Sequence, residues 1–288
     1  MSLSGEGNKP LIFFIDELDR CRPNFAIEVL EKAKHFFSVR NIIFVISIDK
    51  KELGYSIKAI YGNDFDTDGY LRRFIDLNYF LPTPNVQSYC NYLVEKFLFN
   101  SFFENRTHTD LRYDKKHFIE TAVELFSLVG YSLRTIEQCF SQLSIVLRTI
   151  PKDHYMHPVL LVFMVLMKNH NPDLYKKLKL KKCNEEDILL YLHSLDPKNI
   201  FFVKKHLGLV LEAYVALNVS YYLHDGYDSK SQYIKSNYYD KIEDLNTDED
   251  MKQRLQGIIS IFNSLDWNNG NSFLKTLIDK IDISQRFQ

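Results

Sequence analysis

The sequence has few of the residues that interrupt regular structure. Its 288 residues include only 10 glycines and 8 prolines, which leaves few positions for tight turns. It also has almost no excess of charge, because 36 basic side chains balance 37 acidic ones and give a formal net charge of −1. A chain with this balance has no overall electrostatic attraction to nucleic acid or to an anionic membrane. We therefore expect a mostly helical protein that does not bind nucleic acid.

Closely spaced cysteines and long apolar runs are absent as well. The four cysteines form no CxxC pair, which is typical of a reduced protein and predicts a cytoplasmic location. The longest apolar run, PVLLVFMVLM at 158–167, is too short to span a bilayer and predicts a buried core helix. Residues 1–9 are small and polar, like the remnant of a tag or linker.

The first part of the chain alternates predicted strands and helices. Residues 11–16 are apolar throughout, as in a strand that is covered on both faces. A second strand, rich in β-branched residues, is predicted over 41–49. Helices are predicted over 23–37 and 50–62, and Asp49 is placed to cap the second of them.

The remainder of the chain has a different pattern. Residues 75–81 predict a third short strand, which Pro82 ends. From residue 85 onward the sequence shows only helical periods, with no further strand and no internal repeat. The predicted fold class is therefore α/β followed by all-α.

The end of the first predicted strand carries two adjacent carboxylates, Asp16 and Glu17. In open parallel sheets, ligands bind at the carboxyl ends of the strands. An acid there can hold a hydrated Mg²⁺ ion, and its neighbour can orient an attacking water. This pattern is expected of the Walker B motif of a nucleotide hydrolase. The alternative is an exposed strand-to-helix turn with a capping aspartate, and the motif alone leaves both interpretations open.

Three longer stretches resemble one known family. They are FFIDELDRCRPNFAIEVLEKAKHFF, NIIFVISIDKKELGYSIKAIYG and DGYLRRFIDLNYFLPTP. In the same order, over roughly residues 10–85, they are similar to corresponding stretches of the KAP family of P-loop NTPases. A further stretch, YSLRTIEQCFSQL at 131–143, resembles the sensor-2 helix of the lid that follows such NTPase cores.

The resemblance implies a fold and a domain organisation. It implies a partial P-loop NTPase sheet of the ASCE/STAND-like type, parallel and lacking its P-loop strand, followed by a helical lid and a helical C-terminal region. Residues 11–16 and 42–48 should pair in parallel within it. Residues 10–85 would form the partial core with Walker B, sensor 1 and the arginine finger. Residues 86–150 would form the lid with sensor 2, and residues 151–288 the helical C-terminal region.

The resemblance also implies roles for residues at the strand ends. Asp16 resembles the Walker B acid that binds the metal, and Glu17 resembles the residue that positions water. Ser47 and Asp49, at the end of the next strand, lie where related ATPases place a polar sensor facing the γ-phosphate. The implied cofactors are ATP and Mg²⁺. The alternative for Ser47 is a hydrogen bond to a neighbouring strand.

Three arginines match further positions of the family. Arg72 or Arg73 resembles an arginine finger, whose guanidinium neutralises charge on the transferring phosphate from a neighbouring subunit. Arg134 resembles the sensor-2 arginine. As an alternative to the finger, Arg72 and Arg73 would only pair with Asp68 or Asp76.

The sequence departs from the family at one motif. Its 288 residues contain no GxxxxGKS/T, the loop whose backbone amides hold the phosphates. SGEGNKP at 4–10 has the wrong spacing and lies directly before the Walker B strand. The family places its P-loop earlier in the chain, often followed by a long insertion that sometimes spans the membrane. We therefore expect the C-terminal part of a longer protein, with membrane attachment through a segment that these residues do not include.

Two functions follow from these patterns. The first is a nucleotide-dependent switch ATPase, for which the resemblance implies a role in phage exclusion or signalling and partners that are proteins or further copies of the chain. In this interpretation the chain alone is inactive. The alternative is a non-catalytic helical module that binds proteins and carries a degenerate NTPase core.

Two other clusters are weaker candidates. His154 and His157 lie three residues apart but have no third ligand nearby in sequence, so we interpret them as the start of a helix rather than a metal site. The basic cluster YKKLKLKKC at 175–183 has no interleaved aromatic residues. It indicates a solvated helix end rather than a surface for nucleic acid.

Overall fold

The structure is a computed structural model of the whole chain. It describes residues 9–104, 114–151, 157–224, 232–243, 248–264 and 273–283. The chain divides into two compact units, Met1–Pro82 and Thr83–Gln288. Each unit has a hydrophobic core of its own.

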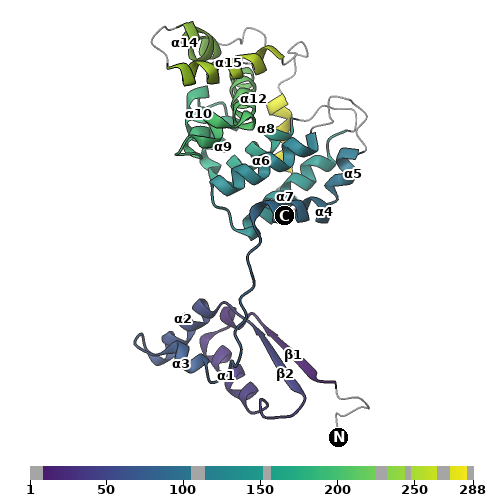
Figure 1. Cartoon of the computed structure of the whole chain (residues 1–288), viewed down its shortest axis with the longest axis vertical. Coiled ribbons are helices and arrows are strands. Elements are labelled where there is room, and N and C mark those ends of the chain that lie inside the picture. Colours follow the sequence, from purple (N-terminus) through teal and green to yellow (C-terminus); the bar gives the residue numbers. More distant parts are fainter. Residues whose placement is uncertain are drawn as a thin grey trace. The chain divides into compact units, whose positions relative to one another are not determined.

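The first unit contains two parallel strands, the helices that connect them and two helices that follow the second strand (Figure 1). Its elements are β1 (Leu11–Asp16), the 3-10 helix η1 (Leu18–Arg20), α1 (Pro23–Lys34), β2 (Ile42–Ser47), α2 (Lys50–Tyr61) and α3 (Thr67–Leu71). β1 and β2 pair in register from Leu11 opposite Ile42 to Asp16 opposite Ser47. The expected parallel pairing of these two runs is therefore confirmed.

The core of this unit lies on the helical side of the two strands. Leu30 of α1 and Leu53 and Ile57 of α2 are fully buried there. Ile15 and Ile46, which face each other across the two strands, pack against this core. Residues that alternate with them point the other way, because successive side chains of a strand lie on opposite faces.

The second face of the strands differs from the prediction. On it, Ile12 and Ile43 are each 47% exposed, Phe14 is 75% exposed and Val45 is 40% exposed. Figure 1 shows α1, α2 and α3 together on one side of the strands. The expectation that 11–16 is covered on both faces is therefore wrong for the described part of this unit. The strand is apolar on both faces, but no described helix of the unit covers the second one.

The prediction of a third strand over 75–81 is also wrong. The described sheet consists of β1 and β2 alone, and residues 75–81 follow α3 without entering it. Leu77 is 85% exposed and Leu81 is 83% exposed. A strand needs a neighbouring edge to pair with, and a pocket separates this segment from Ile46 and Ile48 at the end of β2.

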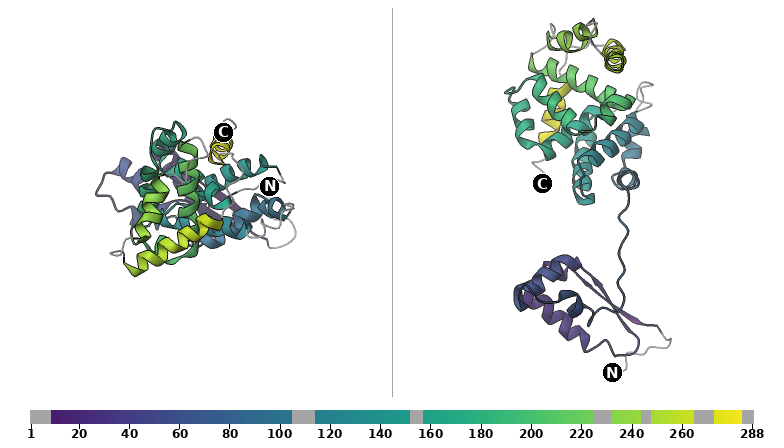
Figure 2. Two further views of the ribbon diagram at one scale, coloured as in Figure 1. Left: turned by 90° about the horizontal axis from the view of Figure 1, so that it is seen from above. Right: turned by 60° about the vertical axis from the view of Figure 1, so that its left-hand side comes forward.

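Every element described in the second unit is helical, as the sequence predicted for the region after residue 85. The elements are α4 (Val86–Lys96), α5 (Phe99–Glu104), α6 (Asp114–Leu128), α7 (Leu133–Arg148), α8 (Pro158–His170), α9 (Pro172–Lys179), α10 (Glu185–Ser194), α11 (Ile200–Lys204), α12 (His206–Leu223), α13 (Gln232–Ile234), the π-helical η3 (Lys235–Tyr239), α14 (Asp240–Glu243), α15 (Glu249–Ser264) and α16 (Phe273–Ile283). α8 and α12 each pack against several of the other helices, and Figure 2 shows the helical unit from two further directions.

Helix α8 lies at the centre of the second unit. All its residues from Pro158 to Lys168 are buried, which confirms the prediction of a core helix at 158–167. Lys168 is accommodated because its ammonium group donates to the carbonyl of Ile281 at 2.9 Å and to Asp282 at 3.1 Å. None of the helices in the described part of the chain combines the length and apolarity needed to cross a bilayer.

His157, one of the two histidines noted in the sequence, lies at the start of α8. Its ring packs edge-on against Tyr214 and Phe273, with centroid distances of 4.8 Å and 4.5 Å. Burial lowers the pKa of His157 to about 3, because an apolar environment disfavours the charged imidazolium. His154 lies outside the described residues.

An aromatic cluster joins the helices that begin this unit. The ring of Phe140 on α7 lies 5.8 Å from that of Phe99 and 6.1 Å from that of Phe118, measured between centroids. All three side chains are buried. Edge-to-face and offset pairs of this kind add to the free energy gained by burial alone.

We expect Phe140→Ala to lower the free energy of unfolding by about 3–5 kcal/mol, because truncation of a buried Phe leaves a cavity in a closely packed core. Equilibrium denaturation in urea, followed by circular dichroism, measures this. Leu190→Ala is the matched control, because Leu190 is 61% exposed and its truncation should change stability by less than about 0.5 kcal/mol. Equal effects of the two substitutions would contradict the assignment of Phe140 to the core.

Candidate functional site

The carboxyl ends of β1 and β2 bring three of the predicted site residues together. Asp16 and Ser47 are directly opposite each other in the strand register, and Glu17 follows Asp16. All three are exposed. The parallel pairing therefore places two carboxylates and one hydroxyl at a single edge, where open parallel sheets bind ligands.

The backbone of Glu17 holds this edge in a turn. Its φ angle is 60°, a left-handed conformation that is uncommon for residues other than glycine. Its N–H donates to Oδ1 of Asp16 at 2.9 Å and to the carbonyl of Ser47 at 3.2 Å. These two bonds end the β1 strand and link the turn to β2. They leave the second carboxylate oxygen of Asp16 without a hydrogen bond to the described residues.

Arg20 is a neighbour of the site that the sequence analysis did not identify. Its guanidinium pairs with the carboxylate of Glu17 across one turn of η1, and Leu18, which is 3% exposed, anchors that turn. The spacing of three residues between Glu17 and Arg20 was a signal that could have revealed the pair. The two side chains are 57% and 60% exposed, so solvent screens the pair and Glu17 stays available to other partners.

Asp49 caps α2, as the sequence predicted. Its Oδ1 accepts from the N–H of Lys51 at 2.9 Å and from the N–H of Glu52 at 3.2 Å. Both bonds end on the same oxygen. The capping role is therefore established by geometry, and the role of Asp49 as a sensor stays a prediction.

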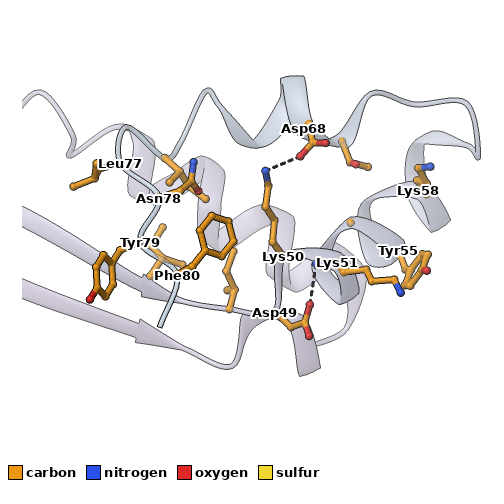
Figure 3. Close-up of a pocket in the computed structure, with 15 residues that line it drawn as sticks. Asp49, Lys50, Lys51, Tyr55, Lys58, Asp68, Leu77, Asn78, Tyr79 and Phe80 are labelled. Carbon is orange, nitrogen blue, oxygen red and sulfur yellow. Dashed lines mark hydrogen bonds and ion pairs between the residues drawn. The ribbon is translucent and has the colours of Figure 1, made fainter. Parts of the chain in front are cut away.

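A pocket of about 700 Å³ lies beside the end of β2 (Figure 3). One wall comes from α2 and the residues before it, and the other from the segment after α3. Its lining residues are Ile46, Ile48, Asp49, Lys50, Lys51, Gly54, Tyr55, Lys58, Thr67, Asp68, Ile75, Leu77, Asn78, Tyr79 and Phe80. Asp49 is therefore the predicted site residue that this pocket contains.

An ion pair crosses the pocket. Nζ of Lys50 lies 2.6 Å from Oδ1 of Asp68, and Figure 3 shows Lys50 extending toward α3 to reach it. The hydrogen bond from Lys50 lowers the pKa of the Asp68 carboxyl, and the nearby charge of Arg72 lowers it further. Asp68 is thus paired with Lys50 and not with either arginine that follows it.

Arg72 and Arg73 follow α3 and are both exposed. The guanidinium carbon of Arg73 lies 6.0 Å from the ring centroid of Tyr70, which is within the range of a cation–π contact. Neither arginine lines the pocket. The arginine-finger role of this pair stays a prediction.

Arg134 belongs to the second unit and is exposed in the first turn of α7. The helix start is set by Ser132, whose Oγ accepts from the N–H of Thr135 at 3.2 Å. Arg134 and the strand ends belong to different units. Its sensor-2 role therefore stays a prediction.

With the geometry of the strand ends established, comparison with known protein families identifies the chain. The family profile described as the KAP family P-loop domain matches residues 3–150, which is more than half of the sequence. The chain belongs to the KAP family. Comparison with curated proteins gave no significant match, and comparison with solved structures gave none either.

A KAP-family P-loop domain implies nucleotide binding, generally with Mg²⁺, and the strand ends fit the metal part of that chemistry. Mg²⁺ keeps several waters and uses one or two protein carboxylates together with phosphate oxygens. Asp16 offers a carboxylate oxygen at an exposed position, with Ser47 beside it. The described residues contain no group of three or more His, Cys, Asp or Glu that could hold a metal ion. Phosphate oxygens would therefore have to complete the coordination.

We expect Asp49→Ala to lower the free energy of unfolding by about 0.5–2 kcal/mol, because the first turn of α2 loses its capping oxygen. Asp49→Asn keeps a capping oxygen and serves as the control, with a change well below that of alanine. Denaturation in urea measures both. A stability unchanged in Asp49→Ala would show that the cap contributes nothing and would leave the side chain free for another role.

Proposed function

We propose that this chain carries the metal and water side of an ATP-hydrolysing site in a KAP-type ATPase that acts as a nucleotide-dependent switch. The observation that supports it most strongly is the register of β1 and β2, which places Asp16, Glu17 and Ser47 at one edge of the sheet. Family membership supports the nucleotide. The two together favour phosphoryl transfer to water over other reactions of paired carboxylates.

Each residue at this edge has a distinct proposed task. Asp16 would hold a magnesium ion through the carboxylate oxygen that the turn leaves free, and the ion would supply positive charge to the phosphates of ATP. Glu17 orients the attacking water and accepts its proton. For this task its carboxylate must release Arg20 and bind the water. Because the ion pair is exposed to solvent, breaking it costs little free energy. Ser47 and Asp49 sense the γ-phosphate from the end of β2.

The arginines would complete the switch. In this proposal Arg72 or Arg73 neutralises charge on the transferring phosphate of a neighbouring subunit. Arg134, on the first turn of α7, reports the nucleotide to the helical unit. The exposure of all three arginines is compatible with both proposals.

The biological setting is proposed from the family resemblance alone. We propose a cytoplasmic protein that serves phage exclusion or signalling, with protein partners or further copies of the chain and no nucleic acid. Membrane attachment would come through a segment outside these residues. The helical unit is the part that would bind partners.

A non-catalytic interaction module is the second candidate. It is favoured by the lack of GxxxxGKS/T in the sequence and by the pairing of Glu17 with Arg20. In this case the two strands would serve as a scaffold and the helical unit would carry the activity. The two candidates differ in whether the carboxylates of the strand ends act on nucleotide.

We expect the chain by itself to show no ATPase activity. Without the amides of a P-loop, nothing holds the triphosphate whose oxygens complete the shell of a metal at Asp16. Phosphate release with and without Mg²⁺ measures this, with Asp16→Ala as the matched control. A Mg²⁺-dependent rate that is lost in Asp16→Ala would contradict the expectation.

In a polypeptide that joins these residues to a GxxxxGKS/T motif, we expect Glu17→Gln to slow ATP hydrolysis by about 100-fold or more, the usual contribution of a positioned general base. Nucleotide affinity should change little, because Glu17 acts on water and not on ATP. Single-turnover hydrolysis and equilibrium binding separate the two effects. An equal loss of binding and turnover would show that Glu17 has a different role, and normal turnover would favour the non-catalytic candidate.

A further inference from the structure

A second pocket lies within the helical unit, between α5 and the end of α7, and we call it the α5–α7 pocket. Its volume is about 380 Å³, which is within the range of pockets that bind small molecules. Most of its wall is apolar. The lining residues are Phe97, Leu98, Phe99, Ser101, Phe102, Ser144, Leu147, Arg148, Ile150 and Pro151. None of the residues at the strand ends is among them.

Arg148 gives the α5–α7 pocket a cation. It is the last residue of α7 and is exposed, and its guanidinium forms no ion pair or hydrogen bond with the described residues. The end of the helix does not occupy it either, because Nζ of Lys280 binds the carbonyl of Thr149 at 2.6 Å. The guanidinium is therefore available to a ligand in the pocket that Arg148 lines.

Ser144 adds a buried hydroxyl to the same wall. The residue is 5% exposed, and its hydroxyl makes no hydrogen bond within the described part of the chain. A buried polar group without a partner is costly, so a ligand that accepts from this hydroxyl would be favoured. Ser144 and Arg148 are four residues apart on α7, which places them on one face of the helix, one turn from each other. One acceptor group can therefore reach both.

The rim of the pocket contains a strained residue. Leu98 has a φ angle of 60°, a left-handed conformation that is an outlier for a bulky apolar side chain. Oγ of Ser101 donates to the carbonyl of Leu98 at 2.8 Å and so supports this turn. As a result Leu98 is 66% exposed beside the pocket. Backbone strain of this kind is concentrated at sites that bind ligands.

We propose that the α5–α7 pocket binds a small apolar molecule that carries one carboxylate, such as a medium-chain fatty acid. The carboxylate accepts from the guanidinium of Arg148, whose planar fork matches two carboxylate oxygens, and from the hydroxyl of Ser144. The apolar chain of the ligand lies among the aromatic side chains of Phe97, Phe99 and Phe102. The apolar wall supplies affinity, and the two polar groups fix the orientation of the ligand.

The charge of the pocket selects a ligand with a single negative charge. Its lining residues include one cation, Arg148, and no carboxylate. A phosphate ester would bring about two negative charges and leave one of them unpaired beside an apolar wall, which is unfavourable. A neutral ligand would leave the guanidinium without its counter-charge. A monocarboxylate satisfies both conditions.

This site does not rest on the proposed ATPase function. All of its lining residues belong to the second unit, and none of them has a proposed task in hydrolysis. The helical unit would thus have a ligand of its own. Failure of either proposal leaves the other unaffected.

Isothermal titration calorimetry of the whole chain with octanoate tests the proposal. The expected result is saturable binding of one octanoate per chain, with a dissociation constant of about 0.1–1 mM for a ligand of this size. 1-Octanol has the same apolar chain without the charge and should bind at least tenfold more weakly. Arg148→Gln should weaken octanoate binding at least tenfold, because it removes a charge-assisted hydrogen bond. Arg40→Gln is the matched control, since Arg40 is an exposed arginine of the other unit.

A second variant tests the place of binding. Ser144→Leu puts a larger apolar side chain into the pocket and should abolish octanoate binding, and circular dichroism confirms that each variant is folded. The proposal would be overturned by the absence of saturable binding, by equal affinity for octanoate and 1-octanol, or by an Arg148→Gln variant that binds normally. A clear preference for a short peptide with a free apolar C-terminus would also overturn it, because the occupant would then be a protein.

Discussion

The backbone pairing of β1 with β2 is the interaction on which the arrangement of the first unit depends. It fixes Asp16 opposite Ser47 and gives Glu17 two acceptors for its N–H, one from each strand. A shift of one residue in this register would exchange the two faces of a strand. Ile15 would then leave the core and Asp16 would turn toward the helices. The position of the carboxylates thus follows from the same pairing that forms the core.

Interactions within a few residues of each strand end hold this arrangement in place. After β1, the turn at Glu17 is followed by Leu18, which is buried against the helices. After β2, Asp49 caps α2, and Leu53 then enters the core one turn later. After each strand, a buried leucine therefore follows the polar side chain within four residues. Polar groups that are exposed yet closely tied to buried anchors keep a defined position at little cost in entropy.

Much of this could be predicted from the sequence because the signals are local. The apolar runs at 11–16 and 42–47, the capping position of Asp49 and the helical periods after residue 85 are each encoded within one element. The strand predicted over 75–81 failed because a strand depends on a partner edge as well as on its own composition. The exposed second face of β1 and β2 was missed for a similar reason, since an apolar run does not reveal which elements will cover it. The pairing of Glu17 with Arg20 depends on the conformation of the turn at Glu17. The spacing of the two residues is compatible with the pair but does not establish that conformation.

The two units differ in how much of its own apolar surface each one buries. In the second unit the helices enclose a large apolar core, and the buried carboxylate of Glu212 on α12 binds His193, Tyr238 and Arg254 from three other elements. In the first unit the core lies on one side of two strands, and the other face of these strands and residues 77–81 remain exposed. The carboxylates proposed for catalysis lie in this unit, whose sheet is covered on one face by the described helices. Any element that covers the exposed face of β1 and β2 would therefore also change the solvent access of Asp16, on which the proposed metal binding would depend.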